Sequence, residues 1–232
     1  MELLDYYFGK IAAAFVRGKL ASELDRSPLS ERLLKTPLDD LSEIELVEII
    51  QTGLAAALRL HKFKQTMGLA RVQKVLGILK GLAPLELLDI GSGRGTFLWP
   101  LVDSFPDLPI TAIDKDEQRV ADILAVHSGG FANISAQIMN ATTLDLDNDS
   151  FDIVTMLEVL EHIPAAPEAL REVVRVAKRF VVISVPSKED DNPEHIHLFN
   201  QDSLNRMLIA AGALRVRCEY VLNHLIAVAK VC

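Results

Sequence analysis

The chain has 232 residues, of which 50% are hydrophobic and 24% are charged, a balance that indicates a folded globular protein. The formal net charge of −8 disfavours, without ruling out, a nucleic acid partner bound through its phosphates. The chain contains no apolar run near the roughly 20 residues that span a bilayer and no signal-peptide pattern, and its cysteines, Cys218 and Cys232, match no disulfide or metal motif. We therefore expect a cytoplasmic protein with no membrane partner.

Residues 1–65 predict a helical extension. Apolar residues recur at helical spacing over residues 3–24, and Ser42 followed by Glu45 forms a capping-box pattern ahead of a second helix. We expect the extension to pack on its own domain, to act as a lid, or to form a homodimer contact. The apolar face of the second helix should comprise Ile44, Val47, Ile50 and Leu54.

Residues 66–232 predict an α/β domain with a mostly parallel sheet. After a helical pattern over residues 66–79, short apolar runs alternate with helical segments, which is typical of βαβ units with helices on both faces. The expected strands are 86–90, 110–114, 134–139, 151–156 and 180–185, and the expected helices are 97–105, 117–126, 167–177 and 203–211. Segments 214–221 and 224–231, joined by a short turn, predict an antiparallel hairpin that completes a seven-stranded sheet.

The first expected strand ends in alternate glycines, Gly91, Gly93 and Gly95, and a helix follows them. Glycines at such a turn let the backbone bend sharply and let a ligand approach the main chain. Asp114, nineteen residues beyond Gly95, ends the second strand, where a carboxylate can accept hydrogen bonds from both ribose hydroxyls. The glycine spacing is tighter than in dinucleotide sites and suits a nucleoside ligand that lacks a pyrophosphate.

Polar residues follow two later strands. Glu158, Glu161 and His162 would share one face if they form a helical turn. His195 and His197 lie in a polar loop after the fifth strand and could close over the same crevice. If a hydroxyl reacts there, His162 is the first choice of base, with His197 or His195 as a second base or orienting group and Glu161 as a further catalytic candidate.

The glycine turn, Asp114 and the Glu-x-x-Glu-His segment together resemble the class I S-adenosylmethionine-dependent methyltransferases over about residues 84–232. The resemblance implies a Rossmann-like sheet, S-adenosylmethionine as the cofactor, and methyl transfer to a small-molecule acceptor, with a hydroxyl oxygen as the expected target. Asn140 departs from the commoner aspartate near the adenine. The cofactor-binding residues that the resemblance implies are Asp89, Gly91, Ser92, Gly93, Gly95, Asp114, Lys115, Asn140, Ala141, Leu157 and Glu158.

Three alternatives stay open. The Glu-x-x-Glu-His segment with a distant histidine also resembles the small-RNA 3′-terminal 2′-O-methyltransferases, in which two glutamates and two histidines hold a divalent ion. That resemblance implies a metal set of Glu158, Glu161, His162 and His197. A nicotinamide-dependent oxidoreductase could use a similar glycine turn and ribose acid, and a non-catalytic Rossmann-like binding protein could keep the fold without turnover.

Overall fold

The computed structural model of the protein describes residues 2–21, 28–189 and 191–232. Its centre is a seven-stranded sheet with the strand order β3-β2-β1-β4-β5-β7-β6, in which the first five strands are parallel and β7 runs antiparallel to both of its neighbours, β5 and β6. This confirms the expected fold class. The strands are β1 (Leu87–Ile90), β2 (Ile110–Asp114), β3 (Ile134–Ile138), β4 (Phe151–Leu157), β5 (Ala177–Pro186), β6 (Arg215–Val221) and β7 (His224–Lys230).

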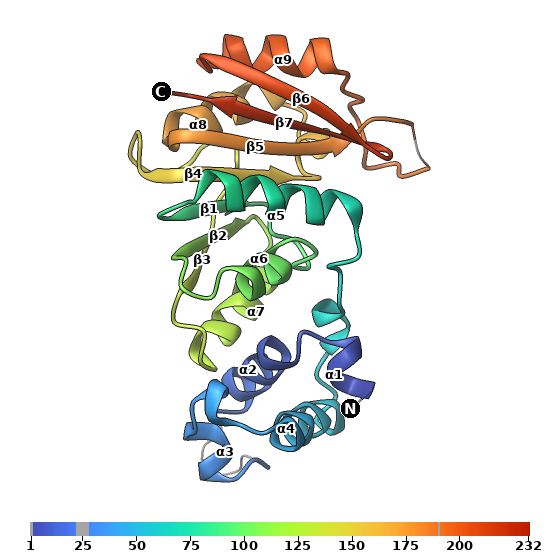
Figure 1. Ribbon diagram of the computed structural model, residues 1–232, viewed down its shortest axis with the longest axis vertical. Helices are drawn as coiled ribbons and strands as arrows, with labels where there is room; N and C mark the ends of the chain where they lie inside the picture. The colour runs from blue at the N-terminus through green and yellow to red at the C-terminus, as the bar shows by residue number, and fades with distance from the viewer. Residues whose placement is uncertain (1, 22–27, 190) are drawn as a thin grey trace.

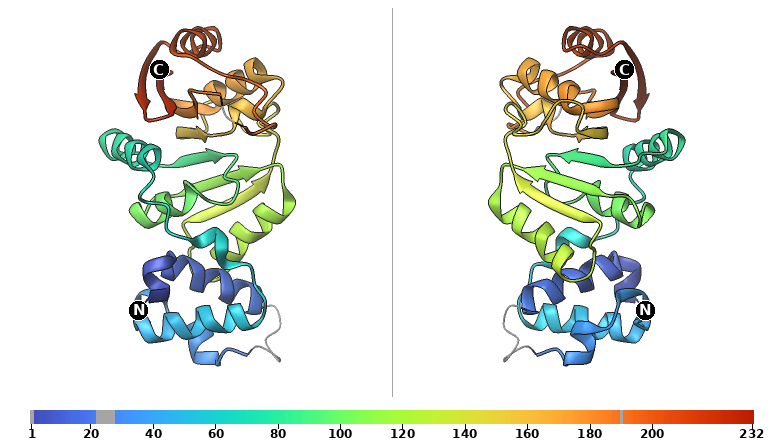
Figure 2. Two further views of the ribbon diagram at one scale, coloured as in Figure 1. Left: turned by 90° about the vertical axis from the view of Figure 1, so that its right-hand side faces the viewer. Right: turned by 90° about the vertical axis from the view of Figure 1, so that its left-hand side faces the viewer.

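Helices cover both faces of the sheet (Figures 1 and 2). Because successive side chains of a strand point to opposite faces, Leu87 and Ile153 belong to one hydrophobic cluster and Leu88 and Val154 to the other. The central strands are therefore apolar on both faces, as expected for parallel strands. The covering helices are α5 (Ala70–Leu82), α6 (Leu98–Ser104) and α7 (Glu117–Ser128) on one side, and α8 (Ala166–Val176) and α9 (Gln201–Ala210) on the other.

The N-terminal extension is helical, but the single helix expected over residues 3–24 is wrong. The chain breaks at Tyr7 and Phe8, where Tyr7 bridges to Lys64 and the Phe8 amide donates to the Phe63 carbonyl at 2.9 Å. Residues 22–24 of that prediction lie outside the described residues. The extension comprises α1 (Glu2–Tyr6), α2 (Gly9–Leu20), α3 (Glu31–Lys35), the 3₁₀ turn η2 (Leu38–Asp40), α4 (Glu43–Ala55) and the 3₁₀ turn η3 (Leu60–Phe63).

Helix α4 begins with the expected capping box. The Glu45 side chain accepts from the Ser42 amide at 2.8 Å, and the Ser42 hydroxyl accepts from the Glu45 amide at 3.4 Å. The expected apolar face is only partly right, because Ile50 is fully buried but Ile44 is 80% exposed and Leu54 is 42% exposed. The close approach of Gly53 to Val16 on α2 sets the rotation of the helix instead. Its buried residues are Leu46, Ile49, Ile50 and Gly53.

Helix α2 packs directly on α7. A Cβ atom on Gly18 would collide with the Ala125 carbonyl, and one on Gly129 would collide with the Ala14 carbonyl. One hydrophobic cluster consequently includes Phe15 of the extension together with core residues of α5, α6 and α7. The domain boundary expected at residue 65 stays a prediction.

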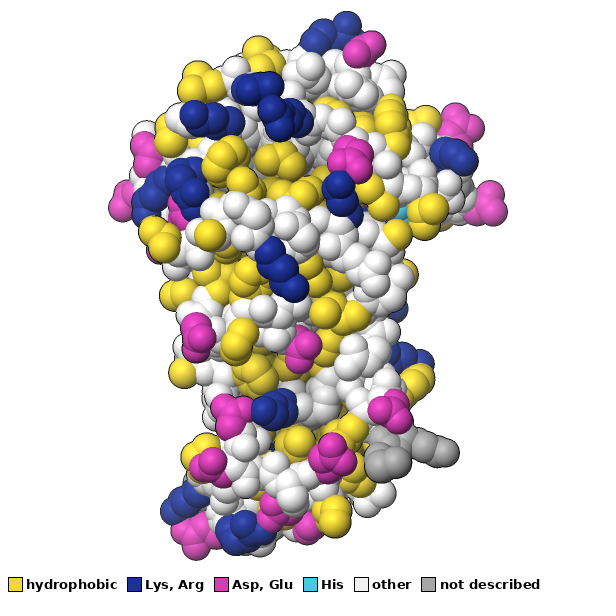
Figure 3. Space-filling view, viewed as in Figure 1, with side chains coloured by type: hydrophobic (Ala, Val, Ile, Leu, Met, Phe, Trp, Pro, Cys, Tyr) yellow, Lys and Arg dark blue, Asp and Glu magenta, His cyan; other side chains and the backbone are white. Residues whose placement is uncertain are grey.

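The remaining expected elements agree with the structure to within a few residues. The largest shift is at the helix expected over residues 66–79, which begins at Ala70 and ends at Leu82, before a left-handed Ala83. Within the described part of the chain, no helix is long and apolar enough to cross a membrane. On the face drawn in Figure 3, several Lys and Arg side chains lie toward the hairpin end, and acidic and basic side chains are mixed over the N-terminal helices.

Candidate active site

The turn after β1 has a backbone conformation that needs glycine. Gly91, Gly93 and Gly95 have φ angles of +71°, +57° and +81°, a region that L side chains rarely adopt. Space is also limiting, because a Cβ atom would collide with Val159 at Gly91 and with the Trp99 indole at Gly95. The alternate glycines therefore permit a tight turn that packs closely on the protein at Gly91 and Gly95 and leaves room beside the main chain at Gly93.

Asp114 lies directly against this turn. Its Oδ2 atom accepts a 2.8 Å hydrogen bond from the Gly93 amide, and its Oδ1 atom accepts from the Asp116 amide at 3.0 Å. The guanidinium of Arg119 lies 3.5 Å from Oδ2. Because each carboxylate oxygen has more than one acceptor site, Asp114 keeps capacity for further donors such as ribose hydroxyls.

Asp89 is a buried carboxyl group at the floor of the site. Its two oxygens accept 2.7 Å hydrogen bonds from the hydroxyls of Ser92 and Thr155. Burial raises the pKa of Asp89 to about 6, although the two hydroxyl donors oppose this and the charge of Asp114 adds to it. Asp89 therefore links the glycine turn to β4 through Ser92 and Thr155.

A cleft opens at the carboxyl ends of β1 and β4. Six of the expected cofactor-binding residues line it, namely Asp89, Gly91, Ser92, Gly93, Leu157 and Glu158. The other five, Gly95, Asp114, Lys115, Asn140 and Ala141, lie outside its lining. The side chain of Asn140 accepts from the amide and the hydroxyl of Thr142, at 3.1 and 3.0 Å.

The sequence interpretation missed five residues of the cleft lining. Three of them, Arg94, Thr96 and Phe97, lie in or next to the glycine turn, and that proximity could have identified them. Two others, Arg71 and Val72, come from α5. Nothing in the local sequence marks α5 as part of the site, because only the packing of the helix beside the turn places them there.

Glu158 has an unusual backbone and a different orientation from the one expected. Its φ angle is +56°, so the chain turns sharply after β4, and the helical turn that follows includes only Leu160–His162. The expectation that Glu158 shares a helical face with Glu161 and His162 is therefore wrong. Its carboxylate instead accepts from the Ser184 hydroxyl at 2.6 Å and lies 3.2 Å from Nε2 of His224.

His224 is a further residue that the sequence interpretation did not connect with the site. It begins β7 and pairs with Pro186 of β5, and this register brings it beside Glu158. No sequence pattern links two residues so far apart. Only the antiparallel addition of β7 to β5 reveals the contact.

Glu161, His162 and His195 form the group of candidate ligands that the described residues bring together. One ligand atom from each lies within 4.8 Å of the others, and Glu161 is fully buried. The rings of His162 and His195 have centroids 4.8 Å apart. The Ile196 and His197 amides both donate to the Glu161 carbonyl, so the polar loop lies against this segment. Closure of the loop over the cleft stays a prediction.

The four-residue metal set of Glu158, Glu161, His162 and His197 is not brought together as mapped. Glu158 is directed toward Ser184 and His224, whereas Nε2 of His197 lies 3.1 Å from the Ile163 carbonyl. His195 stands in the group where His197 was expected. One carboxylate with two imidazoles is nevertheless a donor set that suits divalent transition metals.

The chain is similar in sequence to known methyltransferases. A family model described as a methyltransferase domain matches residues 59–216. A demethylmenaquinone methyltransferase from Chlamydia muridarum is 26% identical over 143 residues, which cover 60% of this chain and 61% of the relative. A ubiquinone biosynthesis O-methyltransferase from Rickettsia bellii is 29% identical over 108 residues, which cover 46% of this chain and 43% of the relative. The chain thus spans between 43% and 61% of the length of these two relatives.

Solved structures share the architecture. A SAM-dependent methyltransferase from Aquifex aeolicus superposes with a TM-score of 0.59 and 23% identity, covering 72% of this chain and 92% of that one. The N-terminal domain of EvdMO1, solved with SAH bound, gives a TM-score of 0.56 and 16% identity, covering 69% of this chain and 81% of that one. At these identities the likeness shows the fold alone.

Proposed function

We propose that this chain, which belongs to the methyltransferase domain family, transfers a methyl group from S-adenosylmethionine to a hydroxyl oxygen of a small molecule. The observation that carries the proposal is the contact between Gly93 and Asp114 beside an open cleft. A glycine turn next to a carboxylate provides main-chain contacts for an amino acid and an acceptor for a ribose.

The cleft also has side chains suited to the carboxylate of the cofactor's methionine part. Arg71 and Arg94 line it, and guanidinium groups bind carboxylates well, so they are our candidates to hold the methionine carboxylate. Asp114 would accept from the ribose hydroxyls, with Lys115 beside the adenosine. Asn140 and Ala141 remain the proposed adenine contacts.

Methyl transfer is an in-line displacement, so the main task of the site is to place the acceptor near the methyl group. The new bond forms between the acceptor oxygen and the methyl carbon, and the bond from that carbon to sulfur breaks, leaving S-adenosylhomocysteine. We assign the base to His162, whose side chain is 32% exposed and whose Nε2 atom lies 3.9 Å from the Glu161 carboxylate. The acceptor proton would pass to this imidazole, with Glu161 and His195 orienting the ring and His197 anchoring the loop.

A divalent ion is a further proposal at the same place. Glu161, His162 and His195 would hold it, because the structure groups one ligand atom from each of them. When bound, such an ion supplies Lewis acidity that lowers the pKa of a coordinated hydroxyl. His162 would then be a ligand rather than the base.

Two observations favour an apolar small molecule as the acceptor. Ile196 and Leu198 are 51% and 52% exposed, so the loop that carries His195 and His197 also presents apolar side chains to solvent. The matched relatives are named for demethylmenaquinone and for ubiquinone biosynthesis. A quinone or a hydroxylated quinone precursor is therefore the first acceptor class to test.

The test has two stages. Calorimetric titration should show binding of S-adenosylmethionine and S-adenosylhomocysteine but not of NAD, and tight binding of NAD alone would overturn the proposal. A screen with radiolabelled S-adenosylmethionine should then show transfer to hydroxylated quinone precursors. Salt-sensitive methylation of RNA instead would favour the RNA 2′-O-methyltransferase alternative. Unchanged turnover after metal removal with a chelator would reject a catalytic ion.

A further inference from the structure

Trp99 packs against the glycine turn and hydrogen-bonds to it. This tryptophan lies on α6, is 2% exposed, and donates from Nε1 to the Arg94 carbonyl at 3.1 Å. Its main-chain amide also donates to the Gly95 carbonyl at 3.0 Å. Because a Cβ atom on Gly95 would collide with the indole, the ring packs directly against the backbone of the turn.

A second donor reaches the same turn from the segment that joins η3 to α5. The Thr66 hydroxyl donates to the Thr96 carbonyl at 2.8 Å. Trp99 and Thr66 therefore fix carbonyl groups on two residues that line the cleft, Arg94 and Thr96. Both donors act from the side of the turn that faces the N-terminal helices.

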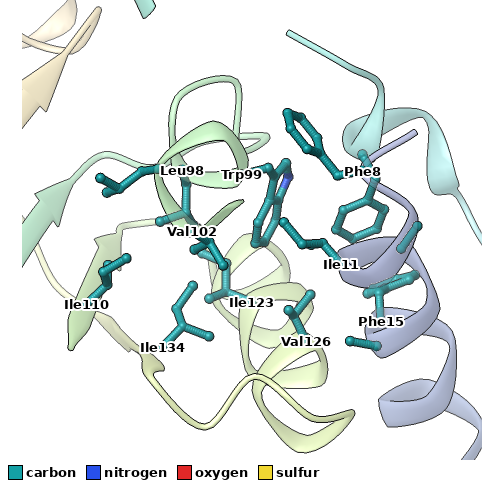
Figure 4. Packing of buried hydrophobic residues seen from close by; sticks show 14 of the residues in the cluster. Phe8, Ile11, Phe15, Leu98, Trp99, Val102, Ile110, Ile123, Val126 and Ile134 are labelled. Atoms are coloured by element: carbon teal, nitrogen blue, oxygen red, sulfur yellow. The ribbon is translucent and has the colours of Figure 1, made fainter. Parts of the chain in front are cut away.

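The N-terminal extension supports Trp99 through aromatic packing. The ring of Phe63 has its centroid 5.1 Å from that of Trp99 and 4.9 Å from that of Phe15 on α2. Figure 4 shows the indole between α6 and α2, beside Phe8 and Ile11. Three tilted rings thus connect the helical extension to the turn that would receive the cofactor.

We propose that Trp99 and Thr66 are positioning residues that hold the glycine turn ready for the cofactor, and that the helical extension serves the site by bracing Trp99. The inference rests on the proposed function. Neither residue needs to touch the cofactor, because both act through the carbonyls that they bind. A turn that is already ordered loses less conformational entropy when a ligand binds, so loss of either donor should weaken binding.

The isosteric variant Thr66→Val tests the second donor, because it removes the hydroxyl and keeps the shape. We expect its dissociation constant for S-adenosylhomocysteine to rise about threefold to tenfold, the range for one net hydrogen bond. Thr66→Ser keeps a hydroxyl and is the matched control, with affinity near that of the wild type. The KM for the acceptor should not change.

Trp99→Phe tests the first donor, because it removes the indole N–H but leaves an aromatic ring. Leu204→Ala on α9, a buried residue of the other hydrophobic cluster, is its control for general loss of packing. Trp99→Phe should weaken cofactor binding more than Leu204→Ala does, and Phe63→Leu should weaken binding in the same direction as Trp99→Phe, because Phe63 braces the indole. Should Trp99→Phe fail to fold, Thr66→Val decides the question.

Hydrogen exchange of the amides of residues 91–96 in the unliganded protein gives a readout that does not depend on activity. Faster exchange there in Thr66→Val, with other regions unchanged, supports the inference. Unchanged exchange and unchanged affinity in Thr66→Val would overturn it. If the wild type itself binds no S-adenosylhomocysteine, the proposed function fails, and the exchange measurement alone then decides whether these donors order the turn.

Discussion

The backbone amide of Gly93 donates a 2.8 Å hydrogen bond to Oδ2 of Asp114, which joins the turn after β1 to the last residue of β2. The two features that would bind the cofactor therefore order each other before any ligand arrives. Asp114 is 4% exposed, so its carboxylate is also largely shielded from competing water. Removing this carboxylate affects both the ribose site and the turn.

We expect Asp114→Ala to weaken S-adenosylhomocysteine binding by about tenfold or more, since each hydrogen bond to a charged group is worth about 1.5–3 kcal/mol. Titration calorimetry measures the effect. Asp114→Asn keeps an acceptor for the Gly93 amide and should bind with intermediate affinity. Equal affinities in the wild type and Asp114→Ala would contradict the ribose assignment.

Gly95→Ala and Gly77→Ala should change stability in opposite directions. Gly95 has a φ of +81° and lies against the Trp99 indole, so alanine there should cost about 1–3 kcal/mol. Gly77 lies within α5 with open space where a Cβ would stand, so alanine there should add about 0.5–1 kcal/mol. Urea unfolding of both variants measures the two changes in stability. A stabilised Gly95→Ala would show that the turn does not need glycine at this position.

The raised pKa of Asp89, about 6, predicts a pH-dependent stability. In the unfolded chain an aspartate titrates near 4, roughly its model value. Between about pH 4 and pH 6 the folded protein therefore binds the extra proton, and the contribution of Asp89 to stability falls as the pH rises. Asp89→Asn cannot ionise, so relative to the wild type it should gain stability from pH 4 to pH 7, on the order of 2 kcal/mol.

Asp152 is a control, because its contribution to stability should change with pH in the opposite direction. The hydrogen bond from Arg179 lowers the pKa of Asp152, so its contribution is present above the ordinary aspartate pKa and is lost as the pH falls through its lowered folded value. Urea unfolding of Asp89→Asn and Asp152→Asn between about pH 2 and pH 7 should give opposite trends against the wild type, mainly above about pH 4 for Asp89→Asn and mainly below it for Asp152→Asn. A pH-independent difference for Asp89→Asn would show that folding does not shift the pKa of Asp89.

His162→Ala should leave cofactor affinity near that of the wild type and slow transfer by about a hundredfold or more, the usual effect of losing a positioned base. Single-turnover transfer and calorimetry separate the two effects. His61→Ala is a suitable control, because this exposed histidine lies on η3, away from Glu161. Full activity in His162→Ala would exclude this histidine as the base.

The sheet and the glycine turn could be predicted from the sequence because local patterns determine them. All four residues of β1 are buried, and the alternate glycines after it occupy the positive-φ positions that require glycine. The hairpin is equally local, since only Leu222 and Asn223 separate β6 from β7. Short apolar strands between such turns leave few alternatives for the pairing order.

Other features depend on contacts between distant segments, which no local pattern encodes. The break at Tyr7 and Phe8 depends on pairing with residues of the η3 segment, and the rotation of α4 depends on Gly53 against Val16. The orientation of Glu158 depends on a histidine of β7. The choice of His195 over His197 depends on how the loop folds over Glu161.

The seam between α2 and α7 leaves no room for a side chain at Gly18 or Gly129. Helix α2 and helix α7 thus share one hydrophobic core. Heating should therefore unfold the N-terminal helices and the α/β domain in a single calorimetric transition. A fragment lacking these helices would expose the apolar flank of α7 to water. We would expect it to aggregate rather than survive as a smaller enzyme.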